Sequence, residues 1–347
     1  MTSVPPEPPH LDLYTRNGFT GPATPIVRAQ YPPPYSRVHG SYAPHRMEVG
    51  ALVTGWPPEP RALPVPLLAG EGVSVEAARR EVPMPFALRN VRADELHYVL
   101  RGQARLETDH GVLDVRAGDF VLLPRAVTYR FGAVAEPLEE IVVVTEDRLT
   151  LRTDDDPEVL DTRRHVDAPA PQGPPPAAEE EYEVVIRHGD GLTSFFHPVD
   201  PLPCLAVEGT PAVRRFRIED VHAPDPAARP DPMPVCLLGD DATRTMIYSV
   251  GSRRTPRPPV HRNADYDEVI VYVAGPGAYG AVDAPGTLLW TPKGVAHQGP
   301  EEDVPGGYRA WLLETRAFLS PTPAGRAVAR LMETSEFGVH PSAADPR

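Results

Sequence analysis

Two histidines and one glutamate in the second half of the chain have the residue types and spacing of metal ligands. Six residues separate His261 from Glu268, and His297 ends the stretch GTLLWTPKGVAH. Two imidazoles and one carboxylate that converge on one cation leave coordination positions open, which suits ferrous iron that must bind a substrate and dioxygen together. A closed structural zinc site would need four protein ligands and commonly uses thiolates. We therefore predict His261, Glu268 and His297 as the metal ligands and catalytic residues.

The local pattern shows how strands and turns bring these side chains together. Residues two apart on a strand point to one face, so His261 and Asn263 are expected to face the same barrel interior. Glu268 begins the apolar run that continues as VIVYV, and a turn at ADYD returns its carboxylate toward His261. His297 follows a Pro-x-Gly turn after the strand-like TLLW. Asn263 is too weak a donor to complete the coordination sphere.

A single histidine in a β-protein usually lies at the surface or makes a hydrogen bond, and His97, His188, His197 and His222 are interpreted in that way. The triad differs because two spaced motifs occur together, His-x6-Glu-x6-Gly and Gly-x5-Pro-x-Gly-x2-His. An N/O triad also accepts manganese, nickel or zinc, so the choice of Fe(II) as the cofactor is a prediction about the preferred metal.

The chain contains two β-rich blocks that repeat one another. The repeat pairs Glu95, Gly102, Gly118, Pro124 and Tyr129 with Glu268, Gly275, Gly286, Pro292 and His297. Leu88 occupies the position of His261, and Tyr129 that of His297. This pattern indicates a duplicated barrel in which the second copy alone keeps a metal site.

Short alternating strands with close turns and little helix predict an all-β fold of two jelly-roll barrels in one chain, followed by a short C-terminal helix. The helix is expected to start near Pro323 and to end before Gly338. The expected ranges are an N-terminal arm at 1–40, a first barrel without metal ligands at 41–152, an acidic Pro-rich linker at 153–181, a metal-binding barrel at 182–322, and a helix and tail at 323–347.

Bulk composition excludes several classes of function. The 347 residues carry a formal net charge of −14, which disfavours nucleic-acid and anionic-membrane partners. No apolar run is long enough to cross a bilayer, and the first residues have neither the basic nor the apolar part of a signal peptide. The two cysteines, Cys204 and Cys236, form no disulfide framework. The 46 prolines fall mostly between strand-like runs. These features predict a cytoplasmic protein.

The segments HRNADYDEVIVYVAG and GTLLWTPKGVAHQGP resemble the paired motifs of the cupin superfamily. Together with YTRNGF, RLETDHGVLDVRAGDFVLLPRAVTYRF and HPVDPLPCLAVEGTPAVRRFRIEDV, they are similar to homogentisate 1,2-dioxygenases of the bacterial type. The resemblance covers most of the chain. It implies a bicupin fold, ferrous iron, and His261, Glu268 and His297 as the iron ligands.

The chain departs from this family around the substrate. Thr291 stands where the family has a second histidine, and Cys236 replaces the histidine of a Pro-Val-His element. Glu208 lies in VEG, where the family has a Trp-acidic-Gly element, and Pro259 replaces a tyrosine. Such changes would alter proton transfer and substrate anchoring. The resemblance therefore implies an iron oxygenase more firmly than it implies homogentisate as the substrate.

These observations predict a non-haem iron(II) dioxygenase that cleaves a small hydroxylated aromatic acid or a related metabolite with O2. One alternative is a metal-dependent cupin tailoring enzyme of specialised metabolism, such as a non-ring-cleaving oxygenase, an isomerase or a decarboxylase. Another is a non-catalytic cupin that binds a small molecule. The first barrel is interpreted as structural, and a homo-oligomer is expected. The candidate substrate-pocket residues are Asn263, Glu208, Tyr279, Trp290 and Arg262.

Arg262 and Arg253 could pair with a substrate carboxylate in bidentate fashion. The alternative is that both are surface arginines that offset the acidic composition of the chain.

Overall fold

Strands form most of the regular structure in the computed structural model, and they are arranged in three sheets. This confirms the expected all-β class. The structure describes residues 10–18, 21–29, 37–152, 159–174, 181–222, 234–251, 260–275, 285–297 and 307–332.

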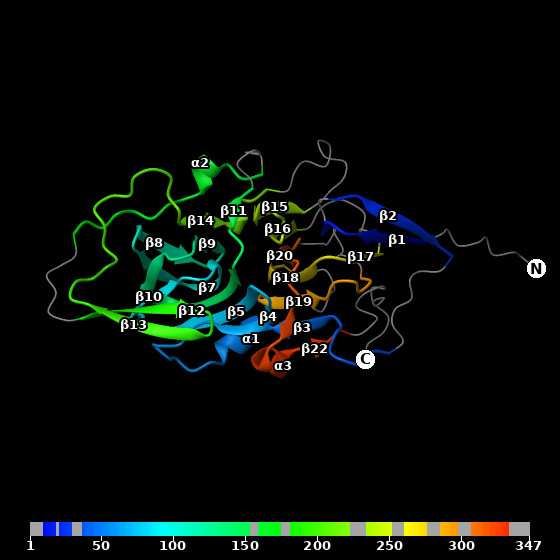
Figure 1. The fold of residues 1–347 in the computed structure, drawn as a ribbon, viewed down its shortest axis with the longest axis horizontal. Coiled ribbons are helices and arrows are strands. Elements are labelled where there is room, and N and C mark those ends of the chain that lie inside the picture. The colour runs from blue at the N-terminus through cyan, green and yellow to red at the C-terminus, as the bar shows by residue number, and fades with distance from the viewer. Residues whose placement is uncertain are drawn as a thin grey trace, which may run out of the picture.

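The first sheet has 11 strands and forms one side of the molecule in Figure 1. Its strands are β4 (Val65–Gly70), β5 (Val73–Arg80), β6 (Ala87–Asn90), β7 (Asp94–Thr108), β8 (Gly111–Arg116), β9 (Asp119–Leu123), β10 (Thr128–Thr145), β12 (Tyr182–His188), β13 (Gly191–His197), β14 (Arg214–Arg217) and β21 (Ser320–Pro321). The main path runs β13-β12-β6-β10-β5-β4-β21, while β7 joins β8, β9 and β10, and β14 joins β9.

The second sheet has eight strands and carries the candidate ligand Glu268. Its strands are β3 (His45–Glu48), β11 (Thr150–Leu151), β15 (Val235–Gly239), β16 (Thr245–Gly251), β18 (Asp267–Ala274), β19 (Thr287–Thr291), β20 (Arg309–Thr315) and β22 (Arg330–Leu331). They follow the order β11-β15-β16-β20-β18-β19-β3-β22. A third sheet combines β17 (Val260–Asn263) with the hairpin of β1 (His10–Thr15) and β2 (Ala23–Arg28), in the order β17-β1-β2.

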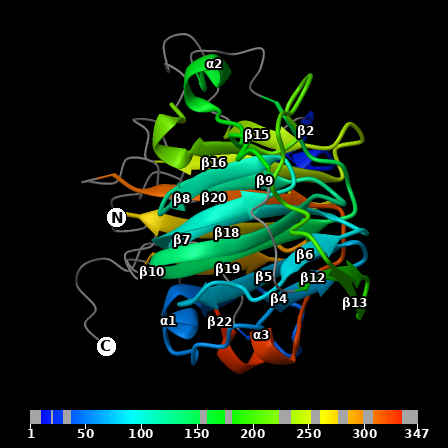
Figure 2. The same cartoon turned by 90° about the vertical axis from the view of Figure 1, so that its left-hand side faces the viewer.

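Helices are few and short. They are α1 (Val49–Thr54), α2 (Thr162–His165), the 3-10 helix η2 (Ile218–Asp220) and α3 (Pro323–Val328). Figure 2 shows α1 and α3 on the same edge of the β structure. None of the described helices has the length and apolar character needed to span a membrane.

The C-terminal helix starts where the sequence predicts and ends earlier. Thr322 caps α3 by accepting a hydrogen bond from the backbone N–H of Gly325, and Pro323 occupies the first turn. The expected continuation toward Gly338 is wrong within the described residues, because Arg330 and Leu331 pair with β3 as strand β22. Backbone groups that bond to a neighbouring strand cannot continue a helix. Gly338 itself lies outside the described residues.

Successive residues of a strand point to opposite faces, so their apolar side chains enter separate cores. On β7, Val99 packs inside the first barrel with residues such as Leu106 and Phe131. Its neighbour Tyr98 points the opposite way, where its ring packs against Phe120 and Trp311. Trp311 belongs to β20, so this second core joins the outer faces of the two barrels. A third core, which includes Tyr248, Tyr272 and Leu312, fills the second barrel.

The two halves of the chain repeat the same element order, and each half completes the barrel of the other. The hairpin β1–β2 pairs through β1, in parallel, with β17, whereas the hairpin β12–β13 pairs through β12, in parallel, with β6. Likewise β3 pairs with β19, and β14 pairs with β9. Figure 1 shows the blue β1–β2 hairpin beside β17, and green β12 and β13 beside the first barrel.

The strands of each sheet therefore come from both of the ranges expected for the two barrels. Residues 182–217, expected in the metal-binding barrel, contribute three strands to the first sheet, and β3, expected in the first barrel, joins the second sheet. Periodicity identifies a strand from its local pattern but carries no information about which distant strand it will pair with. The division at 41–152 and 182–322 stays a prediction about folding units.

Candidate metal centre

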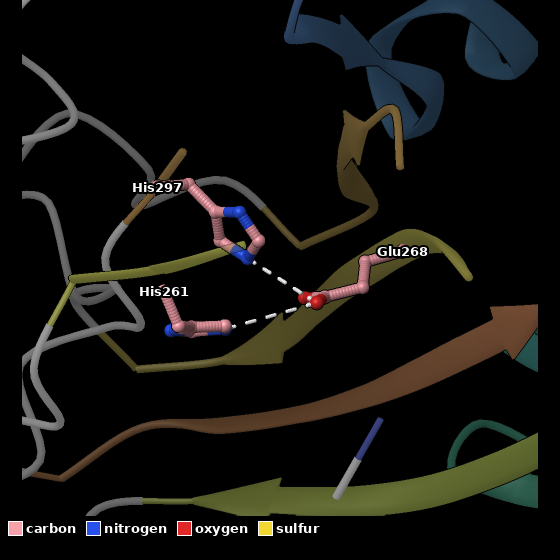
Figure 3. Close-up of side chains that lie close together, drawn as sticks. All are labelled: His261, Glu268 and His297. Carbon is pink, nitrogen blue, oxygen red and sulfur yellow. Dashed lines mark ion pairs between the residues drawn. The ribbon is translucent and has the colours of Figure 1, made fainter. Parts of the chain in front are cut away.

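Three side chains from three separate segments converge at one end of the second barrel. Nε2 of His297 lies 3.2 Å from Oε1 of Glu268, and Nε2 of His261 lies 3.8 Å from the same oxygen. The two imidazole rings have their centroids 4.2 Å apart (Figure 3). One potential ligand atom from each residue lies within 4.8 Å of the others, and no other such group of histidine, cysteine and acidic side chains occurs in the described part of the chain.

Backbone hydrogen bonds fix the two histidines opposite each other. The N–H of His261 donates to the carbonyl of His297 at 2.8 Å, and the reverse bond is 2.9 Å. The turn before His297 is tied to β17, because the N–H of Gly294 donates to the carbonyl of Asn263 at 2.7 Å. Gly294 has a φ of +78°, a left-handed conformation that favours glycine. The Pro-x-Gly spacing read from the sequence thus positions His297.

The charges of Glu268 and His297 stabilise each other inside the barrel, and both side chains are buried. Burial alone would raise the pKa of Glu268, but the imidazoles of His297 and His261 hold that pKa well below its usual range. Burial alone would lower the pKa of His297, but the carboxylate of Glu268 raises it above its usual value. Each of the two groups therefore favours the charged form of the other.

The donor set fits a divalent cation. Nδ1 of His297 lies 3.0 Å from the carbonyl oxygen of Val295, which places a proton on Nδ1 and leaves Nε2 as the nitrogen that faces Glu268. Within the part of the chain that the structure describes, the buried atoms Oε1 of Glu268 and Nε2 of His297 make no hydrogen bond of good geometry. Metal–ligand bonds of about 2.1 Å at right angles would separate neighbouring donors by about 3 Å. The observed 3.2 Å and 3.8 Å are close to that spacing.

A buried carboxylate that the sequence did not single out lies next to this triad. Glu314 on β20 is paired in register with Glu268, and Oε1 of Glu314 accepts a hydrogen bond of 2.9 Å from Nδ2 of Asn263. Burial and the nearby carboxylate of Glu314 together raise the pKa of Tyr248. Asn263 thus faces the interior as predicted, where it binds a second carboxylate. The available signal was the acidic residue at an inward position of the apolar run WLLET.

Cys236 supplies no thiolate to the site. Burial raises the pKa of its thiol to about 12, and Sγ lies 3.4 Å from the carbonyl oxygen of Leu238. Neither Cys236 nor Cys204 forms a disulfide. A neutral thiol is a poor metal ligand, which leaves the two imidazoles and the carboxylate as the donor set.

Two proposed pocket residues lie on the wrong face of their strands. Arg262 follows His261 on β17, so it points away from the site and lies 3.4 Å from Asp12 on β1. Trp290 packs in the core between the barrels, and its Nε1–H donates to Asp267 at 3.0 Å. The assignment of both residues to the pocket wall is wrong.

The remaining pocket residues are not placed at the centre either. Glu208 is an exposed residue of the segment between β13 and β14, which belong to the first sheet, so no contact supports its assignment to the pocket. Tyr279, Arg253 and Pro259 lie outside the described residues.

The first barrel has the same geometry without the ligands. Leu88 pairs with Tyr129 as His261 pairs with His297, and the Tyr129 hydroxyl donates to Glu95 at 2.7 Å. Asn90 donates to Glu95 at 2.8 Å. The hydrogen bond between Tyr129 and Glu95 thus occupies the place of the histidine–carboxylate pair of the second barrel.

An internal ion-pair cluster occupies the first barrel beside Glu95. His97 lies between two carboxylates, 3.0 Å from Glu140 and 3.3 Å from Glu95, and all three side chains are buried. Burial alone would lower the pKa of His97, but Glu140 and Glu95 raise it to about 9. Burial alone would raise the pKa of Glu95, but His97, Tyr129 and Asn90 lower it to about 2. His97 is thus a hydrogen-bonded structural histidine, as predicted.

Two barrels built from one chain, with the paired motifs meeting at the barrel end, constitute the two-barrel cupin fold, and the predicted fold is confirmed. No protein-family model matches the chain. The chain is similar to a salicylate 1,2-dioxygenase from Pseudaminobacter salicylatoxidans, with 11% identity, 83% of this chain and 90% of that chain covered, and a TM-score of 0.50. It is also similar to a Cupin 2 conserved barrel domain protein from Leptotrichia buccalis, with 8% identity, 78% and 95% covered, and a TM-score of 0.44.

Proposed function

We propose that the protein is an iron(II)-dependent dioxygenase that acts on a small hydroxylated aromatic acid, with His261, Glu268 and His297 as the iron ligands. The observation that carries this proposal is the convergence of two imidazoles and one carboxylate within 4.8 Å of one another. A triad of this kind fills three positions of an octahedral ion and leaves the others open. When bound, the iron would supply a redox-active Lewis acid for dioxygen and for a hydroxyl-bearing substrate.

The protein's own groups keep this triad ready for a cation. The Val295 carbonyl fixes the tautomer of His297, and the register of β17 against the turn at Gly294 fixes the direction of both imidazoles. Glu268 is held as an anion at neutral pH, so it offers a charged oxygen without losing a proton first. These groups orient the ligands before the metal arrives, which lowers the cost of binding.

The surroundings of the triad suit an apolar ring more than a strongly hydrated molecule. Ile270 and Tyr272 follow Glu268 on the same face of β18, and Tyr272 packs near Tyr308, with ring centroids 5.8 Å apart. The similar solved structure is named a salicylate 1,2-dioxygenase. Salicylate and gentisate, which carry a carboxylate beside a ring hydroxyl, are therefore the first substrates to test, together with homogentisate.

The test is oxygen consumption by protein reconstituted with Fe(II) without air. We expect O2 uptake with at least one dihydroxyaromatic or hydroxyaromatic acid, and loss of that uptake and of bound iron in Glu268→Gln. Glu208→Gln removes an exposed carboxylate of the same type and should behave as the wild type. Iron-loaded protein that consumes no O2 with any of these acids would refute the proposed reaction.

We also infer that the protein assembles as a homo-oligomer in the cytoplasm. The edge strand β13 supports the assembly, because Leu192, Phe195 and Phe196 are 54%, 49% and 60% exposed on it. An unpaired edge with exposed aromatic side chains is a ready site for pairing with another copy. Light scattering during size-exclusion chromatography should give a mass above 37.8 kDa, and Phe196→Lys should reduce it to that of the single chain.

A further inference from the structure

A large cavity lies outside the candidate metal centre, on the side of the first barrel. Its volume is about 820 Å³, and its walls come from the end of β9, from β11, from α2 and from the segment that leads into β14. None of the lining residues belongs to β17 or β18, and α2 and β14 lie well away from β17 in Figure 1. The lining residues that matter most are Asp94, Leu122, Arg125, Arg148, Pro211 and Arg214.

Three arginines from separate segments surround this space in a protein with a net charge of −14. Within the described part of the chain, the guanidinium groups of Arg148 and Arg214 make neither an ion pair nor a hydrogen bond. Arg125 also lacks an ion pair there, although one of its nitrogens donates to the carbonyl of Glu146 at 2.6 Å. The cavity thus collects cationic groups, exposed in Arg125 and Arg148 and half-buried in Arg214, whose N–H donors have few protein partners among the described residues.

Among the described residues that line the cavity, Asp94 is the one carboxylate, and its oxygens are already hydrogen-bonded. Oδ1 of Asp94 accepts the backbone N–H of Arg125 at 2.8 Å, and Oδ2 accepts that of Leu149 at 2.9 Å. Asp94 is buried and serves to tie two loops together. Among the described lining residues, this one negative charge is outnumbered by three guanidinium groups.

The internal repeat allows a direct comparison, because the second half has a region that matches this cavity. We call each of these two matching regions the corner of its barrel. Asp267 accepts the backbone N–H groups of Lys293 and Leu319, as Asp94 accepts those of Arg125 and Leu149. Arg125 is thus the counterpart of Lys293, and Leu149 is the counterpart of Leu319. The residues just before these two leucines, Arg148 and Phe318, therefore also correspond.

The strand registers complete this correspondence. Leu122 pairs with Arg214 across β9 and β14, and Trp290 pairs with His45 across β19 and β3. Pro211 lies three residues before Arg214, and Tyr42 lies three residues before His45. Pro211 is therefore the counterpart of Tyr42.

In the second half, aromatic side chains fill the corner. The ring of Tyr42 stacks on Phe318 with centroids 5.0 Å apart and lies edge-on to Trp290 at 6.5 Å. The Tyr42 hydroxyl donates to the carbonyl of Lys293 at 2.9 Å. In the first half, proline, arginine and leucine replace these three aromatic residues. The corner is open there, and its walls are cationic.

We propose that this corner of the first barrel is a binding site for a small oxyanion that carries two negative charges, of the phosphate or dicarboxylate class. Arginine presents paired N–H donors that match the oxygens of both groups. The threonine hydroxyls of Thr162 and Thr210 add further donors at the cavity wall. The site would hold this anion independently of the metal centre and of the reaction proposed for it.

Calorimetric titration of the full chain at low salt tests the site, with inorganic phosphate in one arm and succinate in the other. We expect saturable binding of one equivalent in at least one arm, and a weakening of at least tenfold in Arg148→Gln and in Arg214→Gln. Arg105→Gln removes a charge from β7, outside the cavity, and should change the affinity less than twofold. Glu268→Gln should bind the anion normally, which separates this site from the metal centre.

A second variant tests the same site by filling it. Pro211→Tyr introduces the side chain that closes the corner in the other half, and it should abolish anion binding while the far-ultraviolet circular dichroism spectrum stays unchanged. Absence of saturable binding in both arms, or an equal loss in Arg105→Gln and Arg148→Gln, would overturn the proposal.

Discussion

At the scale of single residues, few substitutions separate the candidate metal centre of the second barrel from the structural hydrogen bond at the matching position in the first. Glu95 and Glu268 occupy matching positions, yet Glu95 accepts a hydrogen bond from the Tyr129 hydroxyl, whereas Glu268 faces Nε2 of His297. A phenol with an ordinary pKa near 10 satisfies a buried carboxylate by donating a hydrogen bond. An imidazole whose proton is held on Nδ1 leaves Nε2 available as a metal ligand beside the carboxylate.

Asn263 gives a prediction at this scale, because it connects β17 to the buried Glu314. Asn263→Ala removes a donor from a buried carboxylate, and we expect metal affinity to fall about 10- to 100-fold, as is common when a group that supports the ligands is lost. Competition with a fluorescent chelator measures this affinity. Asn90→Ala is the matched control, since Asn90 donates to Glu95 in the barrel without a metal site. An equal loss in both variants would show that Asn263 acts only on general stability.

At the scale of elements, the ion-pair cluster of the first barrel predicts a pH dependence of stability. The pKa of His97 rises to about 9 on folding, so its contribution is complete below its usual value near 6.5 and is lost as the pH rises toward 9. The pKa of Glu95 falls to about 2, so its contribution is complete above about 4.5 and is lost as the pH falls toward 2. The cluster therefore stabilises the barrel most between these two ranges.

Urea denaturation of the metal-free protein between pH 6.5 and pH 9 tests the histidine part of this prediction. The wild type should lose about 1–3 kcal/mol across this range through His97. His97→Gln should show a flatter profile, whereas His188→Gln, which alters an exposed histidine, should keep the wild-type slope. Identical slopes in the wild type and in His97→Gln would contradict the proposed role of the cluster.

The contact between the N-terminal hairpin and the second barrel gives another prediction for an element. A Cβ atom on Gly18 would overlap the carboxylate of Glu314, and Gly18 also has a φ of +53°. Gly18→Ala should lower the free energy of unfolding by about 2 kcal/mol and weaken metal retention. Gly209→Ala isolates the backbone cost, because Gly209 has a φ of +82° and open space around it. Equal destabilisation by the two variants would exclude a role for the contact with Glu314.

At the scale of the whole molecule, the exchange of hairpins makes the two barrels depend on each other. Each barrel is completed by strands from the other half of the chain, and a shared core joins their outer faces. We expect the protein to unfold in a single thermal transition. A chelator should lower the midpoint of that transition, because a metal at 1,000 times its dissociation constant contributes about 4 kcal/mol to the folded state. Two separate transitions in calorimetry, with only one shifted by the chelator, would contradict this coupling.

Features that depend on residues close together in the sequence could be predicted, whereas features that depend on the pairing of distant strands could not. The convergence of His261, Glu268 and His297 could be predicted because their positions depend on short strands and one Pro-x-Gly turn, all encoded locally. Glu314 was not predicted, since its proximity to Glu268 arises from pairing between β18 and β20.

Trp290 and Arg262 were misplaced because a residue close in sequence to a ligand lies on the opposite face of a strand. The exchange of hairpins depends on contacts between distant strands, which local periodicity does not encode.

The central claim, that three side chains hold one divalent iron and leave part of its coordination sphere open, is tested most directly by a crystal structure of the Fe(II)-loaded protein, with anomalous diffraction measured at the iron edge. The account predicts one strong anomalous peak about 2.0–2.3 Å from Nε2 of His261, Nε2 of His297 and a carboxylate oxygen of Glu268, with the other positions taken by water. No peak at this position, or a fourth protein side chain bound to the iron, would contradict it.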